Sequence, residues 1–370
     1  MRIAYFTSHV YGPDFGLVLP NAPKPNPAGQ NFHELLIRAL AQFASVDVYS
    51  YVPWMLDLEE KDFTAESNIT YHYVKTSTNK IVRAFFGSMK LKRRASKNPC
   101  DIVFFDSLNR SAAKAAIAYA SAKRVPSVAV LTDHPSNVTG ISESYANSII
   151  ATSSKATACY ALTPGLAQTF GFSNKRQFIR PVLVEEKEIK KHEHQHPYIY
   201  FAGALFEKDG LGDLIEAYEK TRPDYDLVIA GHGPYEKEIV EAASKDPRIL
   251  FLGQIDKREH LGWLAGSALA INPRRYKASI DEFAVPSKVM EYLCYAPYIA
   301  STLSTPLKDE FEADINWLDE GTLAFFESSI GKDKTFVSLK ENRARTRIFS
   351  QYGISKTAED LQEFLAKLGA

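Results

Sequence analysis

The sequence predicts an α/β protein with two domains, each built on a parallel β-sheet covered by helices. Short apolar runs alternate with segments of helical periodicity through both halves, as in repeated strand–helix–strand units. At 370 residues the chain exceeds the size of one hydrophobic core and suits two domains of ordinary size. The stretch VEEKEIKKHEHQHP, at 184–197, breaks the alternation with dense charge of both signs and is expected to be a linker.

The domain boundaries follow from that interruption. We expect an N-terminal domain over 1–183, the linker at 184–197, and a C-terminal domain over 198–345. The remaining 346–370 is expected to form a C-terminal helix that packs back on the N-terminal domain. Substrates of parallel sheets bind at the C-terminal ends of the strands, so two such domains facing each other would share one cleft.

In the first half, an apolar run at 2–7 predicts a buried strand, and apolar residues at helical spacing predict a helix over 30–43. Between them lies a long loop, 8–29, that holds five prolines. Loops of this length in compact domains are usually functional or disordered, and we expect this one to capture substrate. An Ala-rich segment predicts a helix over 111–123. Further strands are expected at 46–51, 101–105, 127–132, 160–163 and 177–180.

A second series of alternating patterns begins after the linker. Short apolar runs again predict strands, and the longer segments between them have helical spacing. The expected strands are 198–202, 227–230, 249–252, 268–272 and 298–301, and the expected helices are 211–220 and 235–243.

Composition excludes several classes of protein. The chain is 45% hydrophobic and 24% charged with a formal net charge of zero, so no global field attracts nucleic acid. Cys100, Cys159 and Cys294 lie far apart and offer neither a disulfide framework nor a zinc spacing. No apolar stretch is long enough to span a bilayer, and the chain opens on a strand rather than a signal peptide. We therefore expect a cytoplasmic protein, or one bound to the inner face of the cell membrane.

The segment INPRRYKASIDEFAVPSKVMEYLCYAPYIAS, at 271–301, carries the strongest functional signal. Pro286 suits the start of a helix, and the free amides of the first turn form an anion site together with Ser287 and Lys288. Glu291 lies on the same helix face, one turn deeper. Such a face fits a nucleoside diphosphate, with the phosphates at the helix N-terminus and the carboxylate accepting hydrogen bonds from the ribose hydroxyls.

This segment resembles the nucleotide-sugar site of GT-B glycosyltransferases, in which the pattern P-S-K-x-x-E-Y-x-x-x-x-P-x-I-A-S is common. Other segments of the second half resemble the family in the same order, and the N-terminal half does so more loosely. The resemblance implies two Rossmann-like domains that face each other across a cleft, with the donor bound by the C-terminal one. The matching segments are YFAGALFEKDGLGDLIEAYEK, VIAGHGPYEKEI and ILFLGQIDKREHLGWLAGSALAINP.

The resemblance also implies donor contacts elsewhere in the second half. Gly203 lies at the strand-to-helix turn where relatives place an arginine and a lysine on the diphosphate. Lys208 falls at the lysine position, but Ala204 replaces the arginine. The candidates to replace that arginine follow a strand end that should point into the same cleft: Arg274, Arg275 and Lys277.

Two further donor contacts are weaker. Gln254 follows the Phe-Leu-Gly strand, where relatives contact the base largely through the main chain. Many retaining relatives carry a second glutamate at a fixed distance before Glu291, where this chain has Phe283; Asp281 and Glu282 come just before it. Glu282 is retained as a donor-contact candidate, and the departure leaves open whether the anomeric configuration is retained or inverted.

In the N-terminal half, Gly29 and Gln30 stand where relatives place a glycine pair near the donor phosphate or the acceptor. Asp133 and His134 follow the predicted strand 127–132, at its C-terminal end. An attacking hydroxyl needs a base or an orienting group within hydrogen-bond reach. Asp133 is the natural base of an inverting enzyme, an arrangement similar to the glucuronosyltransferase of xanthan synthesis. His134 matches a donor contact of many retaining relatives, and an Asp-His-Pro turn or helix cap is the alternative for both.

Three other patterns remain. Residues 80–97 combine basic and large apolar side chains without an acid and could lie on anionic lipid, or form an ordinary surface helix. His192, His194 and His196 alternate in the linker and could bind a metal, but a mobile linker is the favoured interpretation. The Asp-x-Asp at 224–226 precedes a strand rather than ending one, so no metal site is predicted from it.

The sequence therefore predicts a glycosyltransferase that moves a sugar from a nucleoside diphosphate sugar, with UDP expected, to a saccharide or lipid-linked saccharide hydroxyl. Polysaccharide or glycoconjugate synthesis is the expected setting. No metal or cofactor is expected, because cations and helix amides would stabilise the leaving diphosphate. The alternatives are a nucleotide-sugar epimerase or hydrolase on the same fold, and a non-catalytic two-domain sugar-binding protein.

Overall fold

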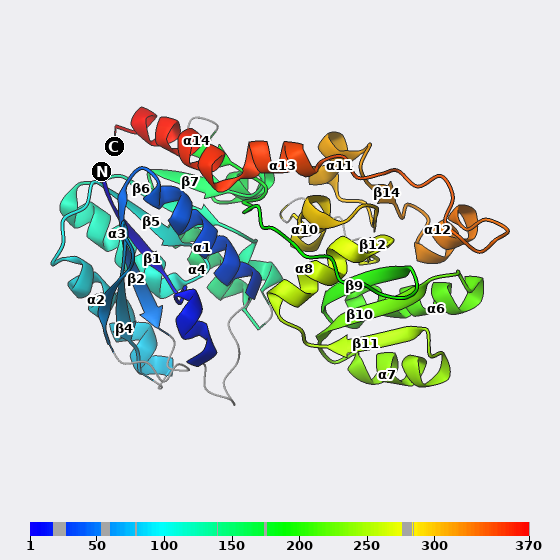
Figure 1. Cartoon of the computed structure of the whole chain (residues 1–370). Coiled ribbons are helices and arrows are strands. Elements are labelled where there is room, and N and C mark those ends of the chain that lie inside the picture. The colour runs from blue at the N-terminus through cyan, green and yellow to red at the C-terminus, as the bar shows by residue number, and fades with distance from the viewer. Residues whose placement is uncertain are drawn as a thin grey trace. The chain divides into compact units, whose positions relative to one another are not determined.

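The computed structural model describes residues 1–17, 27–52, 60–77, 80–138, 140–173, 176–275, 283 and 285–369. The chain forms two compact units, each an α/β layer structure (Figure 1). The first unit comprises Met1–Glu185, Glu282–Ala284 and Gln351–Ala370, and the second comprises Glu186–Asp281 and Val285–Ser350.

The first unit is built on an eight-stranded sheet with the order β3-β4-β2-β1-β5-β6-β7-β8. All neighbouring pairs are parallel except β3 and β4, which form an antiparallel hairpin at the edge. The strands are β1 (Arg2–Thr7), β2 (Ser45–Val52), β3 (Asp62–Glu66), β4 (Ile69–Lys75), β5 (Ile102–Asp106), β6 (Ser127–Leu131), β7 (Ala158–Ala161) and β8 (Gln177–Ile179).

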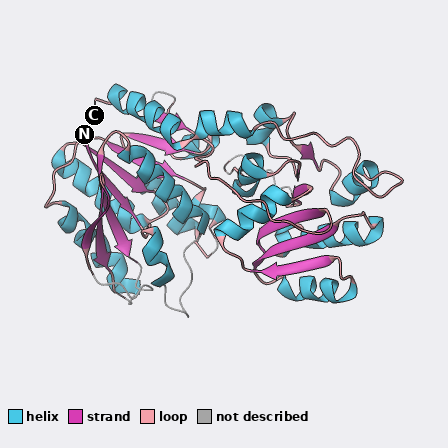
Figure 2. Cartoon of the chain, in the orientation of Figure 1, coloured by secondary structure: helices cyan, strands magenta, loops and turns pink. Residues whose placement is uncertain are grey.

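Helices cover both faces of this sheet (Figure 2). Along each central strand, successive side chains point to opposite faces, and both sets are buried. In β1, Ile3 and Tyr5 join one core with α1 and α14, while Ala4 and Phe6 join the other with α2, α3 and α4. The helices are α1 (Pro27–Ala41), α2 (Lys80–Ala95), α3 (Arg110–Lys123), α4 (Glu143–Ser153), α5 (Pro164–Thr169) and α14 (Ile354–Lys367), with 3-10 turns η1 (Gly12–Leu17) and η2 (Pro135–Asn137).

Helix α14 packs against α1, and Leu361 and Leu365 enter the same core as β1. The guanidinium of Arg180, which follows β8, reaches the carbonyl of Gln351 and the carboxylate of Asp360. The C-terminal segment is thus a structural part of the first unit.

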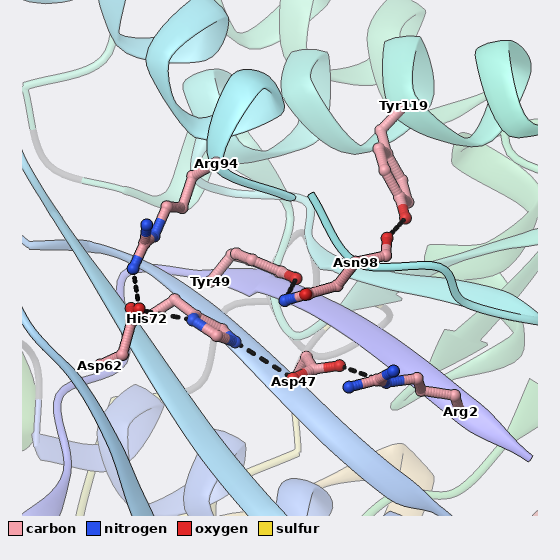
Figure 3. Close-up of polar contacts among 8 residues, drawn as sticks. All are labelled: Arg2, Asp47, Tyr49, Asp62, His72, Arg94, Asn98 and Tyr119. Atoms are coloured by element: carbon pink, nitrogen blue, oxygen red, sulfur yellow. Dashed lines mark hydrogen bonds and ion pairs between the residues drawn. The ribbon is translucent and has the colours of Figure 1, made fainter. Parts of the chain in front are cut away.

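A chain of ion pairs ties α2 to the sheet (Figure 3). Arg94 of α2 pairs with Asp62 of β3, and His72 of β4 bridges Asp62 and Asp47 at 2.9 and 3.1 Å. Arg2 completes the chain on Asp47 at 2.8 Å. Burial alone would raise the pKa of Asp47, but the hydrogen bonds from His72 and Arg2 lower it.

The second unit holds a six-stranded sheet with the order β11-β10-β9-β12-β13-β14, parallel throughout. Its strands are β9 (Tyr198–Ala204), β10 (Asp226–His232), β11 (Ile249–Gly253), β12 (Leu269–Asn272), β13 (Ile299–Ser301) and β14 (Asn316–Trp317). Helices α6 (Leu211–Thr221), α7 (Glu236–Lys245) and α12 (Thr322–Ser329) share one core with the sheet. Helix α8 (Lys257–Gly266) packs against β9 and against α10 (Ser287–Tyr295), and α11 (Thr305–Phe311) and α13 (Arg345–Tyr352) follow.

The α/β fold class is confirmed, and the expected strands 2–7, 198–202 and 249–252 coincide closely with β1, β9 and β11. The β3–β4 hairpin was not predicted, because β3 is an edge strand whose side chains are only partly covered. Helix α1 begins at Pro27, not at Gln30, since proline is well suited to the first helical position. Gly29 and Gln30 therefore lie in the first turn of a helix, which corrects the prediction that the loop extends to Gly29.

Within the charged stretch 184–197, residues 186–197 belong to the second unit, and the histidines are held there, so their interpretation as part of a mobile linker is wrong. The amide of His192 donates to the carbonyl of Gly262 at 3.0 Å, and its ring stacks on Trp263 at 3.6 Å between centroids. His194 pairs with Asp226 at 2.7 Å. The alternating imidazoles thus have local partners in α8 and β10.

Candidate functional site

Loops at the C-terminal ends of β9 and β12 in the second unit approach each other backbone to backbone. Gly210 has a φ of +77°, and a Cβ there would lie 1.9 Å from the carbonyl oxygen of Pro273. Gly203, at the end of β9, has a φ of +148°, and its Cβ would lie 2.2 Å from Cε of Lys288. At Gly210 the obstacle is backbone, so glycine is required there; at Gly203 the positive φ favours glycine, and a Cβ would also push the flexible end of Lys288 aside. The predicted Gly203 and Lys288 are therefore brought together.

Lys288, the second residue of α10, lies above the end of β9. Its Nζ is 3.7 Å from Oδ1 of Asp209 and 4.5 Å from the ring centroid of Phe201. Burial lowers the pKa of Lys288, Asp209 raises it, and the positive charges of Arg274 and Lys208 lower it further. Lys208 and Arg274 therefore lie near enough to act electrostatically on Lys288, and three positive charges with one carboxylate favour an anion.

Arg275 is engaged elsewhere, so it is the weaker substitute for the missing arginine. Its guanidinium forms a bidentate pair with Asp213 of α6, with both distances 3.0 Å. Arg274 instead influences Lys288 directly. The third substitute, Lys277, lies outside the described residues.

Helix α10 begins at Ser287, and Pro286 is its N-cap with φ −69° and ψ 99°. The carbonyl of Pro286 accepts from the amides of Val289 and Met290 at 2.9 and 3.3 Å. As the N-cap, Pro286 precedes the first helical turn, and its carbonyl accepts the first hydrogen bonds of the helix. The prediction that Pro286 lies within that turn is corrected by one residue. The amides of Ser287 and Lys288 lie at the helix N-terminus, where the partial positive charge of the helix favours an anion.

Glu291, one turn further into α10, is held by α8. Its Oε2 is 2.7 Å from Nε2 of His260, and its Oε1 pairs with Lys257. Nδ1 of His260 in turn meets the hydroxyl of Tyr200 at 2.9 Å. Burial by itself would raise the pKa of Glu291, but the hydrogen bond from His260 and the charge of Lys257 lower it to about 2. Glu291 is therefore ionised and can accept hydrogen bonds.

Sequence reasoning identified Glu291 but missed His260 and Lys257. Both lie on one face of α8, three residues apart, in the segment that follows the Phe-Leu-Gly strand. Among the other donor candidates, Gln254 is exposed directly after β11. Glu282 lies outside the described residues.

In the first unit, Asp133 and His134 lie between β6 and η2, at the C-terminal end of the strand as predicted. Oδ1 of Asp133 accepts from the amide of His134 at 2.7 Å and from the side chain of Asn137 at 2.9 Å. Nδ1 of His134 accepts from the amide of Ser136 at 3.2 Å, and its ring lies 5.1 Å from that of Phe283. Both side chains thus stabilise a turn, and their catalytic roles stay predictions.

Gln30 ties α1 to the loop that follows β1. Its side-chain Oε1 accepts from the amide of Val10 at 2.9 Å, and its Nε2 donates to the carbonyl of Ser8 at 3.4 Å. Gly29 precedes it in the first turn of α1. The contacts of the Gln30 side chain are therefore with the protein's own backbone.

A buried polar cluster that sequence reasoning missed joins side chains of β1, α1 and β5. The hydroxyl of Tyr5 meets Nδ1 of His33 at 2.7 Å, and Nε2 of His33 is 3.7 Å from Asp106. Nδ1 of His9 lies 3.2 Å from the hydroxyl of Tyr71. Burial lowers the pKa of His9 to about 3. These side chains come from separate elements, so no local pattern could have predicted the cluster.

Within the described parts of the chain, no helix is both long and apolar enough to cross a membrane. The same residues contain no group of three or more His, Cys, Asp or Glu side chains that could hold a metal ion.

Comparisons with known proteins give a family match for part of the chain and a fold match for nearly all of it. Residues 196–313 match the family model described as glycosyl transferases group 1. Solved structures of other proteins resemble nearly the whole chain at low sequence identity, which establishes the fold, and three of them are described next. A comparison with curated protein sequences found no match.

The first resembling structure, a lipopolysaccharide outer core galactosyltransferase, WaaB, in its apo form, has a TM-score of 0.62 at 12% identity, covering 99% of each chain. Anabaena HepE in complex with UDP and glucose has a TM-score of 0.66 at 12% identity, with 99% of each chain covered. A UDP-forming α,α-trehalose-phosphate synthase from Burkholderia vietnamiensis has a TM-score of 0.63 at 8% identity, covering 99% of this chain and 100% of the other.

These findings confirm the resemblance inferred from the motifs, while the expected cleft between the domains stays a prediction. The family model covers the strands and loops that carry Gly203, Lys208, Lys288 and Glu291. The chain has the GT-B fold, and its residues 196–313 match the glycosyl transferases group 1 family model.

Proposed function

We propose that this protein transfers a sugar from a UDP-sugar to a hydroxyl of a saccharide or lipid-linked saccharide, and that UDP is the leaving group. The observation that carries the proposal is the charge arrangement at the strand ends of the second unit. Lys208, Arg274 and Lys288 gather beside the N-terminus of α10, and ionised Glu291 lies one turn beyond. A diphosphate suits the cations and amides, and a ribose suits the carboxylate.

The choice of UDP draws support from the resembling structures. HepE was solved with UDP, with UDP-glucose, and with UDP and glucose, and the trehalose-phosphate synthase is UDP-forming. Gln254, exposed after β11, is proposed to lie beside the base. Gly203, by leaving space at the end of β9, allows Lys288 to stand over the site.

In the proposed reaction, the acceptor oxygen attacks the anomeric carbon and the bond from that carbon to the diphosphate oxygen breaks. The diphosphate leaves with the electron pair, and Lys208, Arg274, Lys288 and the α10 amides stabilise its charge. We expect these groups to suffice without a metal ion. The acceptor's proton passes to Asp133 in an inverting reaction, whereas a retaining reaction would assign the neighbouring His134 to the donor sugar.

A membrane surface is the proposed location of the acceptor, on the cytoplasmic side and in polysaccharide or glycoconjugate assembly. On α2, Phe86 and Met89 are 61% and 64% exposed. Arg93 is exposed at helical spacing from them and shares their side of the helix, and Lys97 is exposed in the turn that follows α2. Lys90 and Arg94, by contrast, pair with Glu60 and Asp62. An apolar strip with a cationic flank suits an interfacial helix on anionic lipid.

Calorimetric titration with UDP in the presence of EDTA tests the donor site. We expect wild-type protein to bind UDP, and Lys288→Met to raise Kd at least about tenfold, because a charge-assisted hydrogen bond contributes roughly 1.5–3 kcal/mol. Lys220→Met, which removes an exposed lysine paired with Glu216 on α6, is the control and should leave Kd unchanged. Absence of UDP binding in wild type, with or without added Mg²⁺, would contradict the proposal.

Vesicle sedimentation tests the membrane contact. Arg93→Ser with Lys97→Ser should release the protein from anionic vesicles, since each basic residue near such a surface contributes about 1 kcal/mol. Phe86→Ser with Met89→Ser should weaken binding as well. Both double variants should turn over a short soluble acceptor at the wild-type rate. If either pair leaves vesicle binding unchanged, α2 is an ordinary surface helix.

A further inference from the structure

Two side chains of α8 contact the carboxylate of Glu291, one at each oxygen, and they differ in their exposure to solvent. His260, with a side chain 13% exposed, meets Oε2 at 2.7 Å. Lys257, with a side chain 54% exposed, pairs with Oε1. His260 is largely covered and is held by a second hydrogen bond from Tyr200, whereas more than half of the Lys257 side chain is exposed to solvent.

The hydrogen bonds of His260 determine which of its nitrogens carries the proton. Glu291 is ionised, so it only accepts, and Nε2 of His260 must donate to it. In the neutral ring Nδ1 is then an acceptor, and the Tyr200 hydroxyl 2.9 Å away donates to it. Burial raises the pKa of Tyr200, so that hydroxyl keeps its proton. Tyr200 on β9 therefore orients His260 on α8, which orients Glu291 on α10.

A ribose presents two neighbouring hydroxyls, and a carboxylate serves both only if its plane is fixed. His260 uses one lone pair of Oε2, whereas the exposed Lys257 pairs with Oε1. We propose that His260 is a positioning residue that fixes the Glu291 carboxylate for the nucleotide's ribose hydroxyls, and that Lys257 occupies this carboxylate until nucleotide binds. The inference rests on the proposed function and extends it to residues on α8.

Selectivity for ribose hydroxyls is the measurement that separates this role from general support of the fold. UDP and 2′,3′-dideoxy-UDP differ only in the two hydroxyls that the carboxylate would bind. We expect wild type to bind UDP at least about tenfold more tightly than the dideoxy compound, as for a hydrogen bond to a charged group. A residue that merely stabilises the unit would change both dissociation constants together.

Two amide substitutions form a matched pair at His260. His260→Gln places an N–H donor where Nε2 lies and should keep most of the hydroxyl preference. His260→Asn reaches only the Nδ1 position, keeps a polar group toward Tyr200, and should reduce the preference to less than about threefold. Its affinity for 2′,3′-dideoxy-UDP should stay within about twofold of wild type. Melting temperatures of both variants check that the unit remains folded.

Lys257→Met tests the second half of the inference. Loss of the competing ion pair should tighten UDP binding by up to about fivefold, consistent with an exposed pair, and leave the dideoxy compound unaffected. Tenfold weaker UDP binding would instead make Lys257 a ligand contact and overturn its assigned role. If His260→Asn keeps the wild-type hydroxyl preference, the positioning role of His260 is overturned while the proposed function stands. If wild type binds neither compound, the proposed function fails and the inference with it.

Discussion

Asp133 is a residue that takes part in a turn and is also proposed to act in the reaction. Its Oδ1 holds the turn through the amide of His134 and the side chain of Asn137. The carboxylate of Asp133 is also the candidate base of an inverting reaction. The position, directly after β6 in the first unit, is where parallel sheets place substrate contacts.

Asp133→Asn should slow transfer by about 10²–10⁴-fold, the usual contribution of a positioned acid or base, with UDP affinity nearly unchanged. The asparagine carbonyl can still accept from the His134 amide, so the turn should persist. Initial rates with saturating donor and a separate UDP titration measure the two effects.

His134→Ala is the matched control for Asp133→Asn. It removes the side-chain acceptor for the Ser136 amide but leaves the carboxylate in place. Loss of transfer in His134→Ala together with a near-normal Asp133→Asn would identify His134 as the working residue. A retaining reaction would then be expected, and NMR of the product's anomeric proton would report it.

At the scale of elements, the donor site depends on how closely the loops after β9 and β12 approach each other. Gly203 ends β9, and the side chain of Lys288 from α10 occupies the space that a Cβ would need. This packing brings the cation of one helix over the end of a strand distant in sequence. The proposed phosphate site is thus a product of loop packing as much as of charged residues.

Gly203→Ala should raise the Kd for UDP at least about tenfold, because the new methyl group displaces Lys288 from the end of β9. Gly321→Ala is the control, since Gly321 has a φ of +92° but open space around its Cβ. It imposes comparable backbone strain on the same unit without touching the site. Equal UDP affinity in the two variants would show that Lys288 tolerates the displacement.

At the scale of the whole molecule, the two units differ in how they should respond to acid. The first unit buries His9 and His33, of which only 1% and 5% of the surface is exposed to solvent. Burial lowers the pKa of His9 to about 3, with a further contribution from His33. Burial also lowers the pKa of His33, although Asp106 opposes the shift. Both rings are therefore neutral in the folded protein at neutral pH.

The first unit should lose stability as pH falls from about 6.5 towards 3, and show no dependence on these histidines above 6.5. In that window the unfolded chain binds protons near its ordinary histidine pKa while folded His9 does not, so each such group contributes a slope of at most ~1.4 kcal/mol per pH unit. Hydrogen exchange of the β1 and β2 amides between pH 5 and 7.5 measures this slope.

His9→Asn should make that slope shallower, because asparagine does not titrate and can keep a polar group toward Tyr71. Comparing the two proteins at each pH cancels the intrinsic chemistry of exchange. The β10 and β11 amides of the second unit serve as the internal control and should respond equally in both proteins. The same slope for β1 in both proteins would mean that His9 does not govern the acid response.

The sequence by itself determined the α/β class, most strand positions and the residues of the donor segment. Apolar periodicity is a local property, so β1, β9 and β11 could be placed from a few neighbouring residues. The Pro-Ser-Lys start of α10 and Glu291 one turn later were likewise predictable, since helix geometry fixes which nearby residues share a face.

Only the tertiary structure decided which side chains act on these residues. His260 and Glu291 are 31 positions apart, and they meet because α8 and α10 pack together beside β9. The choice of Arg274 over Arg275 depended on Asp213 in α6, and the histidines of the linker met their partners on α8 and β10. Spacing along the chain cannot encode such pairs, because burial and register between elements are set by the packing of the whole unit.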